Sequence, residues 1–235
     1  LATIFTAAMT ISLVPAISES RALEDFKSIR DKIRLGFRAA MIINFPCFVG
    51  LFFLAEKVAG LIYNAPGAAG AIQTMSAGIL FLGMHQISTG VLQGLEHTAV
   101  PVINMILAGV VKVALSWWLT ALPELGVKGA ALATVADFAV AAVLNMCFIY
   151  KYTGFCMTFG SVAKPLLSSG IMGGVIFVVL HFTESFGAWA ILFAMAAAVP
   201  TYGFSLLACG GLHQEDLEGT PFIGRRILAL GQKIG

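Results

Sequence analysis

Long apolar segments separated by short polar or glycine-rich turns dominate the chain. Each segment has close to the ~20 residues that a helix needs to cross a hydrocarbon core of about 30 Å. They lie near residues 1–17, 35–55, 71–95, 99–122, 129–150, 165–182 and 186–211. Residues 213–235 mix charged and apolar positions, and we interpret them as a polar interfacial tail. The pattern predicts an all-α, polytopic membrane helix bundle with about seven spanning helices.

A charged stretch from residue 19 to 38 separates the first two apolar segments. Its apolar residues recur at steps of three and four, which is the spacing of one face of a helix. Two interpretations stay open: an amphipathic helix lying along the membrane surface, or a solvated connecting helix. The apolar positions of this face are Leu23, Phe26, Ile29, Ile33 and Phe37.

Composition supports a membrane protein and excludes several other classes. Hydrophobic residues make up 59% of the chain and charged residues 11%, whereas soluble domains carry about 25% charged residues. The net charge of +2 is too small to indicate a nucleic-acid partner. The four cysteines show no C-x-x-C or zinc-type spacing, so we expect neither a metal nor a cofactor.

The distribution of basic residues predicts an orientation. With seven spans, eleven of the 14 Lys and Arg residues fall on one side of the membrane. Loops rich in Lys and Arg stay in the cytoplasm, so this side, with the C-terminus, is expected to be cytoplasmic. The eleven residues are Arg21, Lys27, Arg30, Lys32, Arg34, Arg38, Lys151, Lys164, Arg225, Arg226 and Lys233.

Two charged residues fall inside predicted spans. Lys112 and Asp137 lie on the fourth and fifth segments, which a short turn at residues 122–129 joins. At about 1.5 Å per residue, their depths from the turn are about 15 Å and about 12 Å, near the membrane midplane. Ionisable groups there are costly unless they pair or face water. We therefore expect the two side chains to meet, either as a functional site or as a structural ion pair.

Uncharged polar residues inside the spans are further candidates. Asn44, Gln86, Asn104 and Asn145 are predicted to line a cavity, although such residues also join helices by hydrogen bonds. Gly83, Gly90 and Gly94 share one helix face, which indicates close helix packing rather than chemistry.

Enzyme signatures are absent from the sequence. It contains no H-E-x-x-H, G-x-S-x-G or glycine-rich phosphate loop. The four histidines lie on different segments, and a lone histidine in an apolar span is more often a packing residue than a catalyst. We predict that the protein is not an enzyme and has no catalytic residues.

An ordered set of short motifs resembles one transporter family. The chain is similar to polysaccharide-biosynthesis flippases of the stage V sporulation protein B type, which are related to lipid II flippases. No single motif is decisive, but the set runs along nearly the whole chain. The matching stretches are residues 12–18, 92–95, 101–104, 126–134, 152–155 and 215–217.

The resemblance implies a fold and a function. Such flippases belong to the multidrug, oligosaccharidyl-lipid and polysaccharide exporter superfamily, whose helices form two lobes around a central cavity. They move undecaprenyl-linked sugars across the bacterial plasma membrane by alternating access. The chain opens on Leu1 in an apolar run, so we expect it to be the second lobe of a longer protein. Its partners would then be the missing N-terminal lobe, membrane lipids and the lipid-linked substrate. The essential arginines of the lipid II branch lie largely in the missing lobe and match no residue here.

Three functions therefore compete. The first is a flippase in which Lys112 contacts the substrate phosphate and Asp137 holds it at rest. The second is a cation-coupled multidrug antiporter in which Asp137 binds Na⁺ or H⁺ and Lys112 is its counter-ion. The third is a non-transporting membrane subunit that supports envelope assembly.

Overall fold

The computed structural model of the chain describes residues 2–157, 159–183, 186–187 and 189–210. No strand occurs in this part of the chain. Seven of its helices are long and apolar enough to cross a membrane, which confirms the predicted all-α membrane bundle. The elements are α1 (Ala2–Ala22), α2 (Phe26–Leu61), the 3-10 turn η1 (Pro66–Ala68), α3 (Ala69–Gly94), α4 (Ala99–Thr120), α5 (Gly126–Thr153), α6 (Phe159–Phe182) and α7 (Trp189–Ala208).

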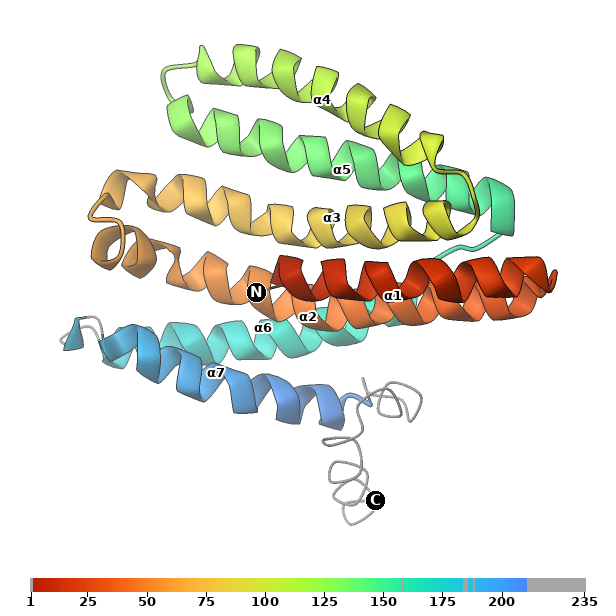
Figure 1. Cartoon of the computed structure of the whole chain (residues 1–235). Helices are drawn as coiled ribbons and strands as arrows, with labels where there is room; N and C mark the ends of the chain where they lie inside the picture. Colours follow the sequence, from red (N-terminus) through yellow and green to blue (C-terminus); the bar gives the residue numbers. More distant parts are fainter. Residues whose placement is uncertain (1, 158, 184–185, 188, 211–235) are drawn as a thin grey trace.

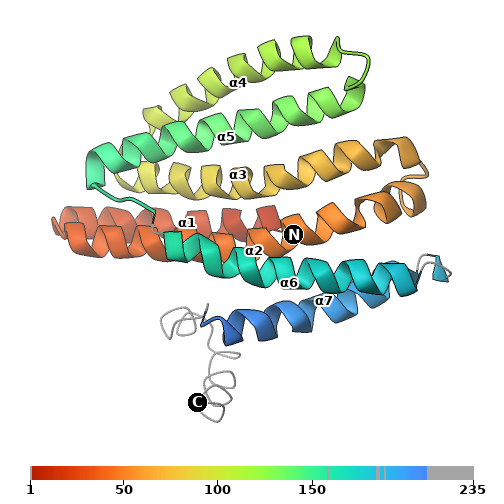
Figure 2. The same cartoon turned by 180° about the vertical axis from the view of Figure 1, so that it is seen from behind.

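The helices lie side by side, with axes roughly along one direction (Figures 1 and 2). Helix α4 packs on α5, α5 on α3, and α3 on both α1 and α2. On its other side, α2 packs on α6, which packs on α7. Helix α2 is therefore central, while α4 and α7 form the two edges of the array (Figure 1).

Helix α2 corrects the interpretation of the charged stretch. Residues 26–61 form one continuous helix of 36 residues, about 54 Å long at 1.5 Å per residue. Asp25 caps its start by accepting a hydrogen bond from the Ser28 backbone N–H at 2.9 Å. Ile29, Ile33 and Phe37 are buried in the protein core. The predicted helical face is real from Ile29 to Phe37, whereas Leu23 and Phe26 are exposed. Neither a surface helix nor a solvated connecting helix is present, because the buried part of this face packs in the core and the helix continues into the span.

Two apolar clusters form the core, and α2 contributes to both. The first lies where α1, α2, α3 and α5 meet; its largest members are Ile17, Ile29, Ile33, Phe37, Ile87, Leu92 and Ile149. The second joins α2 to α6 and α7 through Val49, Leu54, Met172, Ile176, Ala194 and Ala198. Because α2 contributes residues to both clusters, this one helix connects the two halves of the array.

The predicted glycine face of α3 is a close helix contact. A Cβ added at Gly90 would lie 2.5 Å from Thr10 Cγ2, and one added at Gly94 would lie 2.8 Å from the Val14 carbonyl oxygen. Ser18 Oγ also donates to the Gly94 carbonyl at 3.1 Å. Helices α1 and α3 therefore approach with their backbones nearly in contact, as small-xxx-small motifs allow in membranes.

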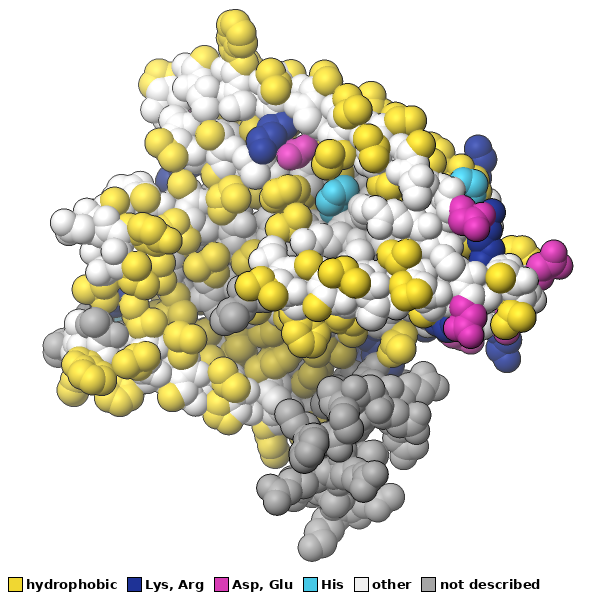
Figure 3. Space-filling view, in the orientation of Figure 1, with side chains coloured by type: hydrophobic (Ala, Val, Ile, Leu, Met, Phe, Trp, Pro, Cys, Tyr) yellow, Lys and Arg dark blue, Asp and Glu magenta, His cyan; other side chains and the backbone are white. Residues whose placement is uncertain are grey.

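Charged side chains gather at the end of the bundle where α1 ends and α2 begins (Figure 3). Several of them join helix ends. Lys32 Nζ donates to the Ala16 carbonyl at 2.8 Å and to Ser20 Oγ at 2.7 Å. Arg21 pairs with Glu96 at 3.3 Å. These basic residues thus fasten the turn between α1 and α2 to its surroundings.

Candidate functional site

The ion pair inside the membrane segments is the first feature of the site. Helices α4 and α5 run antiparallel, and Lys112 Nζ lies 3.5 Å from Asp137 Oδ2. The expectation that these two side chains meet is confirmed. The Lys112 side chain is 41% exposed and the Asp137 side chain 16% exposed, so the pair is open on the side of the lysine.

The distance between Lys112 Nζ and Asp137 Oδ2 shows how the two charged groups interact. Charge-assisted N–H···O bonds are usually about 2.7–2.9 Å long, so 3.5 Å describes attraction between charges rather than a short hydrogen bond. Among the described residues, Asp137 is the one ionic or hydrogen-bonding partner recorded for the ammonium. Lys112 therefore keeps donors for another anion.

Helix α4 presents two different faces around Lys112. Its outward face is apolar: Val110 and Val113 are 64% and 67% exposed, and α4 packs mainly on α5. Ser116 and Thr120 follow Lys112 at steps of four residues and share its side of the helix. The polar stripe therefore runs beside the apolar surface and adjoins it at Val113.

A buried hydrogen-bond network lies two helical turns from the ion pair. Asn104 Nδ2 on α4 donates to Asn145 Oδ1 on α5 at 2.8 Å. The Asn145 amide nitrogen faces three acceptors on α3: Ser88 Oγ at 3.1 Å, Thr89 Oγ1 at 3.2 Å and His85 Nδ1 at 3.4 Å. The network thus ties α3, α4 and α5 together within the membrane.

The four predicted cavity residues differ in their exposure and in their contacts. Asn44, Asn104 and Asn145 are buried between helices, at 1%, 2% and 0% exposure. Their geometry supports contacts between helices. Gln86 is half-buried on α3, where its Oε1 accepts a hydrogen bond from Thr6 Oγ1 on α1. Of the four, Gln86 alone retains appreciable exposure in this structure.

His85 joins the buried network from α3. A lone histidine in a span was expected to be a packing residue with one hydrogen bond, and its ring Nδ1 lies 3.4 Å from the Asn145 amide nitrogen. The space-filling view shows a basic and an acidic side chain meeting over α4 and α5, with a histidine beside them (Figure 3). No local sequence pattern places His85 here, because its contact with Asn145 depends on the packing of α3 on α5.

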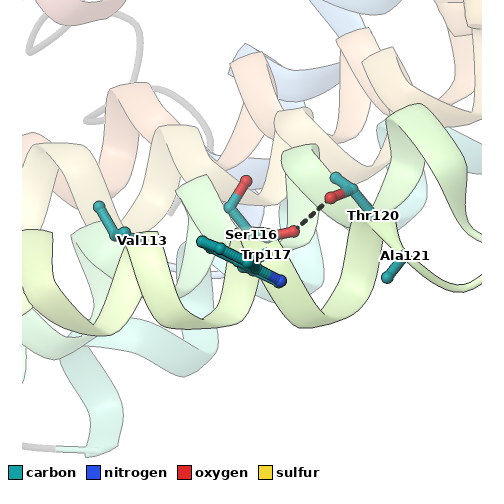
Figure 4. A pocket seen from close by; sticks show the side chains of 5 residues that line it. All are labelled: Val113, Ser116, Trp117, Thr120 and Ala121. Atoms are coloured by element: carbon teal, nitrogen blue, oxygen red, sulfur yellow. Dashed lines mark hydrogen bonds between the residues drawn. The ribbon is translucent and has the colours of Figure 1, made fainter.

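A shallow depression lies on α4 beyond Lys112. Val113, Ser116, Trp117, Thr120 and Ala121 line it, with Trp117 lying along the helix (Figure 4). Thr120 Oγ1 donates to the Ser116 carbonyl at 2.6 Å. The exposed Trp117 near the helix end is typical of aromatic belts at membrane interfaces. The depression therefore marks a membrane boundary rather than an enclosed substrate site.

Comparisons with known proteins agree on one family. The family model described as "Lipid II flippase MurJ" matches residues 1–201. The uncharacterized membrane protein YabM of Bacillus subtilis (strain 168) is 27% identical over 238 residues, covering 94% of this chain and 43% of YabM. Stage V sporulation protein B of the same organism is 26% identical over 225 residues, with 95% and 43% covered.

A more distant relative and a solved structure agree with this assignment. The probable low-salt glycan biosynthesis flippase Agl15 of Haloferax volcanii is 23% identical over 176 residues, covering 74% of this chain and 37% of Agl15. The structure titled "Lipid II flippase MurJ, inward closed conformation" has a TM-score of 0.71 at 17% identity, with 87% of this chain and 43% of that chain covered. That likeness shows a shared fold. The chain spans less than half the length of the curated relatives it matches.

Proposed function

Because the chain belongs to the family of lipid II flippase MurJ, whose model matches residues 1–201, we propose that it forms one lobe of a transporter for lipid-linked precursors. The resemblance seen in the sequence motifs is thereby confirmed. The chain is a multi-pass membrane protein with the fold of these flippases. The proposed cargo is an undecaprenyl-linked oligosaccharide or peptidoglycan precursor, moved across the bacterial plasma membrane by alternating access. We propose transport alone, without enzymatic activity.

The ion pair Lys112–Asp137 is the observation that carries this proposal. A charged residue at the centre of a membrane helix costs about 2.5–3.5 kcal/mol on insertion scales, so such residues mark substrate or ion pathways. A lipid-linked sugar carries a diphosphate, which needs a cation in a water-accessible space. Lys112 supplies a cation whose side chain is 41% exposed.

The geometry suggests how the cation would be used. At rest, Asp137 neutralises the ammonium from 3.5 Å away, without a short hydrogen bond. An incoming phosphate offers more oxygen acceptors than this carboxylate contact uses. Lys112 would then exchange the carboxylate for the phosphate, and Asp137 would recover it when the substrate leaves.

The face that carries this pair also fits the proposed partners. We propose that the missing N-terminal lobe lies across the side of α3, α4 and α5 where Lys112 opens. The outward apolar side of α4, with Val110 and Val113 exposed, would face membrane lipids. No nucleic-acid partner is proposed.

Flipping by the full-length protein tests the function directly. In proteoliposomes, a fluorescent polyprenyl-diphosphate-linked sugar should become accessible to an external quencher faster than in protein-free vesicles. Ion-gradient-dependent export of a cationic dye, without movement of the lipid probe, would instead support the antiporter. If neither probe moves while the gene still supports growth of a deletion strain, the non-transporting subunit becomes the better account.

The proposed orientation places the basic end of the bundle in the cytoplasm. Single cysteines at Gly67 and Lys27 report on opposite ends of α2. In intact cells, an impermeant thiol reagent should label the Gly67→Cys variant and leave Lys27→Cys unlabelled. Permeabilised cells provide the control, because both positions should then react. External labelling at position 27 would show that the orientation is the reverse of the proposed one.

The C-terminus, proposed to be cytoplasmic, belongs to residues 213–235, which lie outside the described residues.

A further inference from the structure

Pro46 divides the packing of α2 into two parts. The α2 residues of the first apolar cluster all precede this proline, and those of the second cluster all follow it. They are Ile29, Ile33, Phe37 and Ala40 before it, and Val49 and Leu54 after it. The first part of α2 belongs to a packing group with α1, α3 and α5, and the second part to a packing group with α6 and α7. Pro46 therefore lies at the boundary between two packing groups.

Helix α2 lacks one backbone hydrogen bond at this boundary. Proline has no backbone N–H, so the carbonyl four residues earlier, that of Ile42, receives no helical donor from it. An unpaired carbonyl inside a membrane is costly, because the hydrocarbon contains no water to bind it. Such a position is also where a helix bends most readily.

Tyr202 on α7 supplies the missing donor. Its hydroxyl donates to the Ile42 carbonyl oxygen at 2.6 Å. The tyrosine is half-buried, and its helix packs on α6. The bond therefore joins the second packing group to the backbone of α2 just before the proline.

Helices α6 and α7 are well placed to move with the second part of α2. A Cβ added at Gly173 on α6 would lie 2.8 Å from Val49 Cγ1 and 2.7 Å from Phe53 Cε2, so α6 approaches this part of α2 closely. Ser205 Oγ on α7 donates to the Ser168 carbonyl on α6 at 3.4 Å. The second packing group thus has close contacts and a hydrogen bond of its own.

The boundary also holds polar atoms that a different bend of α2 would use. Asn44 Nδ2 lies two residues before the proline, and Ser168 Oγ and Ser169 Oγ lie on α6. All three atoms are buried, and among the described residues none has a hydrogen-bond partner. Buried unpaired donors are costly. A bend that brings them to acceptors would therefore offset the loss of the Tyr202 bond.

We propose that residues 42–46 of α2 form a hinge and that Tyr202 is its latch. While the hydroxyl holds the Ile42 carbonyl, α6 and α7 are fixed to the first packing group. When the hydroxyl lets go, the second part of α2 turns at Pro46 and carries α6 and α7 with it. The inference concerns the motion of this lobe and stands whatever cargo the protein moves.

Distances between two spin labels test the hinge without any substrate. The full-length protein, in vesicles of phosphatidylethanolamine and phosphatidylglycerol, carries Leu192→Cys on α7 and Val143→Cys on α5 as its sole cysteines. Both native side chains are exposed. Pulsed electron paramagnetic resonance should give one narrow distance distribution. Tyr202→Phe, which loses only the hydroxyl, should broaden this distribution or add a second distance.

Pro46→Ala tests whether the proline is the reason that a latch is needed. Alanine restores a backbone N–H that binds the Ile42 carbonyl within the helix. The double variant Pro46→Ala with Tyr202→Phe should therefore return to one narrow distribution. An unchanged distribution in Tyr202→Phe alone, or a broad one in the double variant, would overturn the inference.

Two controls separate a hinge from general loosening of the bundle. Labels at Ile11 on α1 and Val143 on α5 both lie in the first packing group, so Tyr202→Phe should leave the distance between them narrowly distributed. Tyr150→Phe removes a hydroxyl from an exposed side chain of α5 and should change neither label pair. Broadening of both label pairs in Tyr202→Phe would show lost packing instead of a hinge and would also overturn the inference.

Discussion

Gly94→Leu is expected to remove most of the folded protein from the membrane. A Cβ at this position would lie 2.8 Å from both the Val14 carbonyl oxygen and Ile17 Cβ on α1. One of these atoms is backbone, so no side-chain rotation relieves the clash. Overpacking usually costs about 1–3 kcal/mol and sometimes more. We expect the upper end here, because relief requires α1 and α3 to separate.

Two other glycine positions provide a variant with a smaller expected loss and a control variant with none. Gly90→Leu should also reduce folded protein, but less, because its closest contact is the methyl group of the Thr10 side chain. Gly109 on α4 has open space around it, so Gly109→Leu should accumulate normally. The measurement is the amount of monodisperse full-length protein after detergent extraction, compared across the three variants. Equal yields for Gly94→Leu and Gly109→Leu would show that α1 and α3 do not need their close approach.

The helix class was predictable because membrane insertion imposes a coarse and strong pattern. An apolar run of about 20 residues has few alternatives to a spanning helix, and the predicted Gly90–Gly94 face packs as expected. Helix continuity was harder to predict. Charges at residues 27–38 indicated a break, yet α2 continues from Phe26 to Leu61 and includes both Gly36 and Pro46.

Within the candidate site, the sequence predicted only the contact that follows from charge and from depth in the membrane. Lys112 and Asp137 could be matched from their distances to one turn, which fixes their level along two antiparallel helices. The contact of His85 with Asn145 depends on the packing of α3 on α5, which no local pattern in the sequence records. For the same reason, three of the four predicted cavity residues proved to be buried between helices. Polarity in a span does not say whether a side chain faces a neighbouring helix or a cavity, and among the described residues the buried Asn44 Nδ2 has no hydrogen-bond partner.

Lys112→Met is expected to abolish flipping and also to destabilise the protein. Asp137 is the more buried partner, at 16% exposure against 41% for Lys112. Removing the lysine therefore strands the less accessible charge. The loss of one partner of a fully buried pair costs about 3–5 kcal/mol, which is an upper value for this half-open pair. Asp137→Leu should cost less stability, because the remaining ammonium can turn toward the open face.

The double variant Lys112→Met with Asp137→Leu distinguishes the two roles of the pair. It leaves no unpaired charge, so folded protein should recover to near the level of the unaltered protein. If Lys112 binds the substrate phosphate, flipping should remain absent in this well-folded variant. Lys112→Arg should retain part of the activity, since it keeps the charge and changes the geometry. Abundance and flipping are measured in parallel for both single variants, the double variant and the arginine variant. Full flipping by the double variant would refute the substrate role and leave Lys112–Asp137 as a structural ion pair.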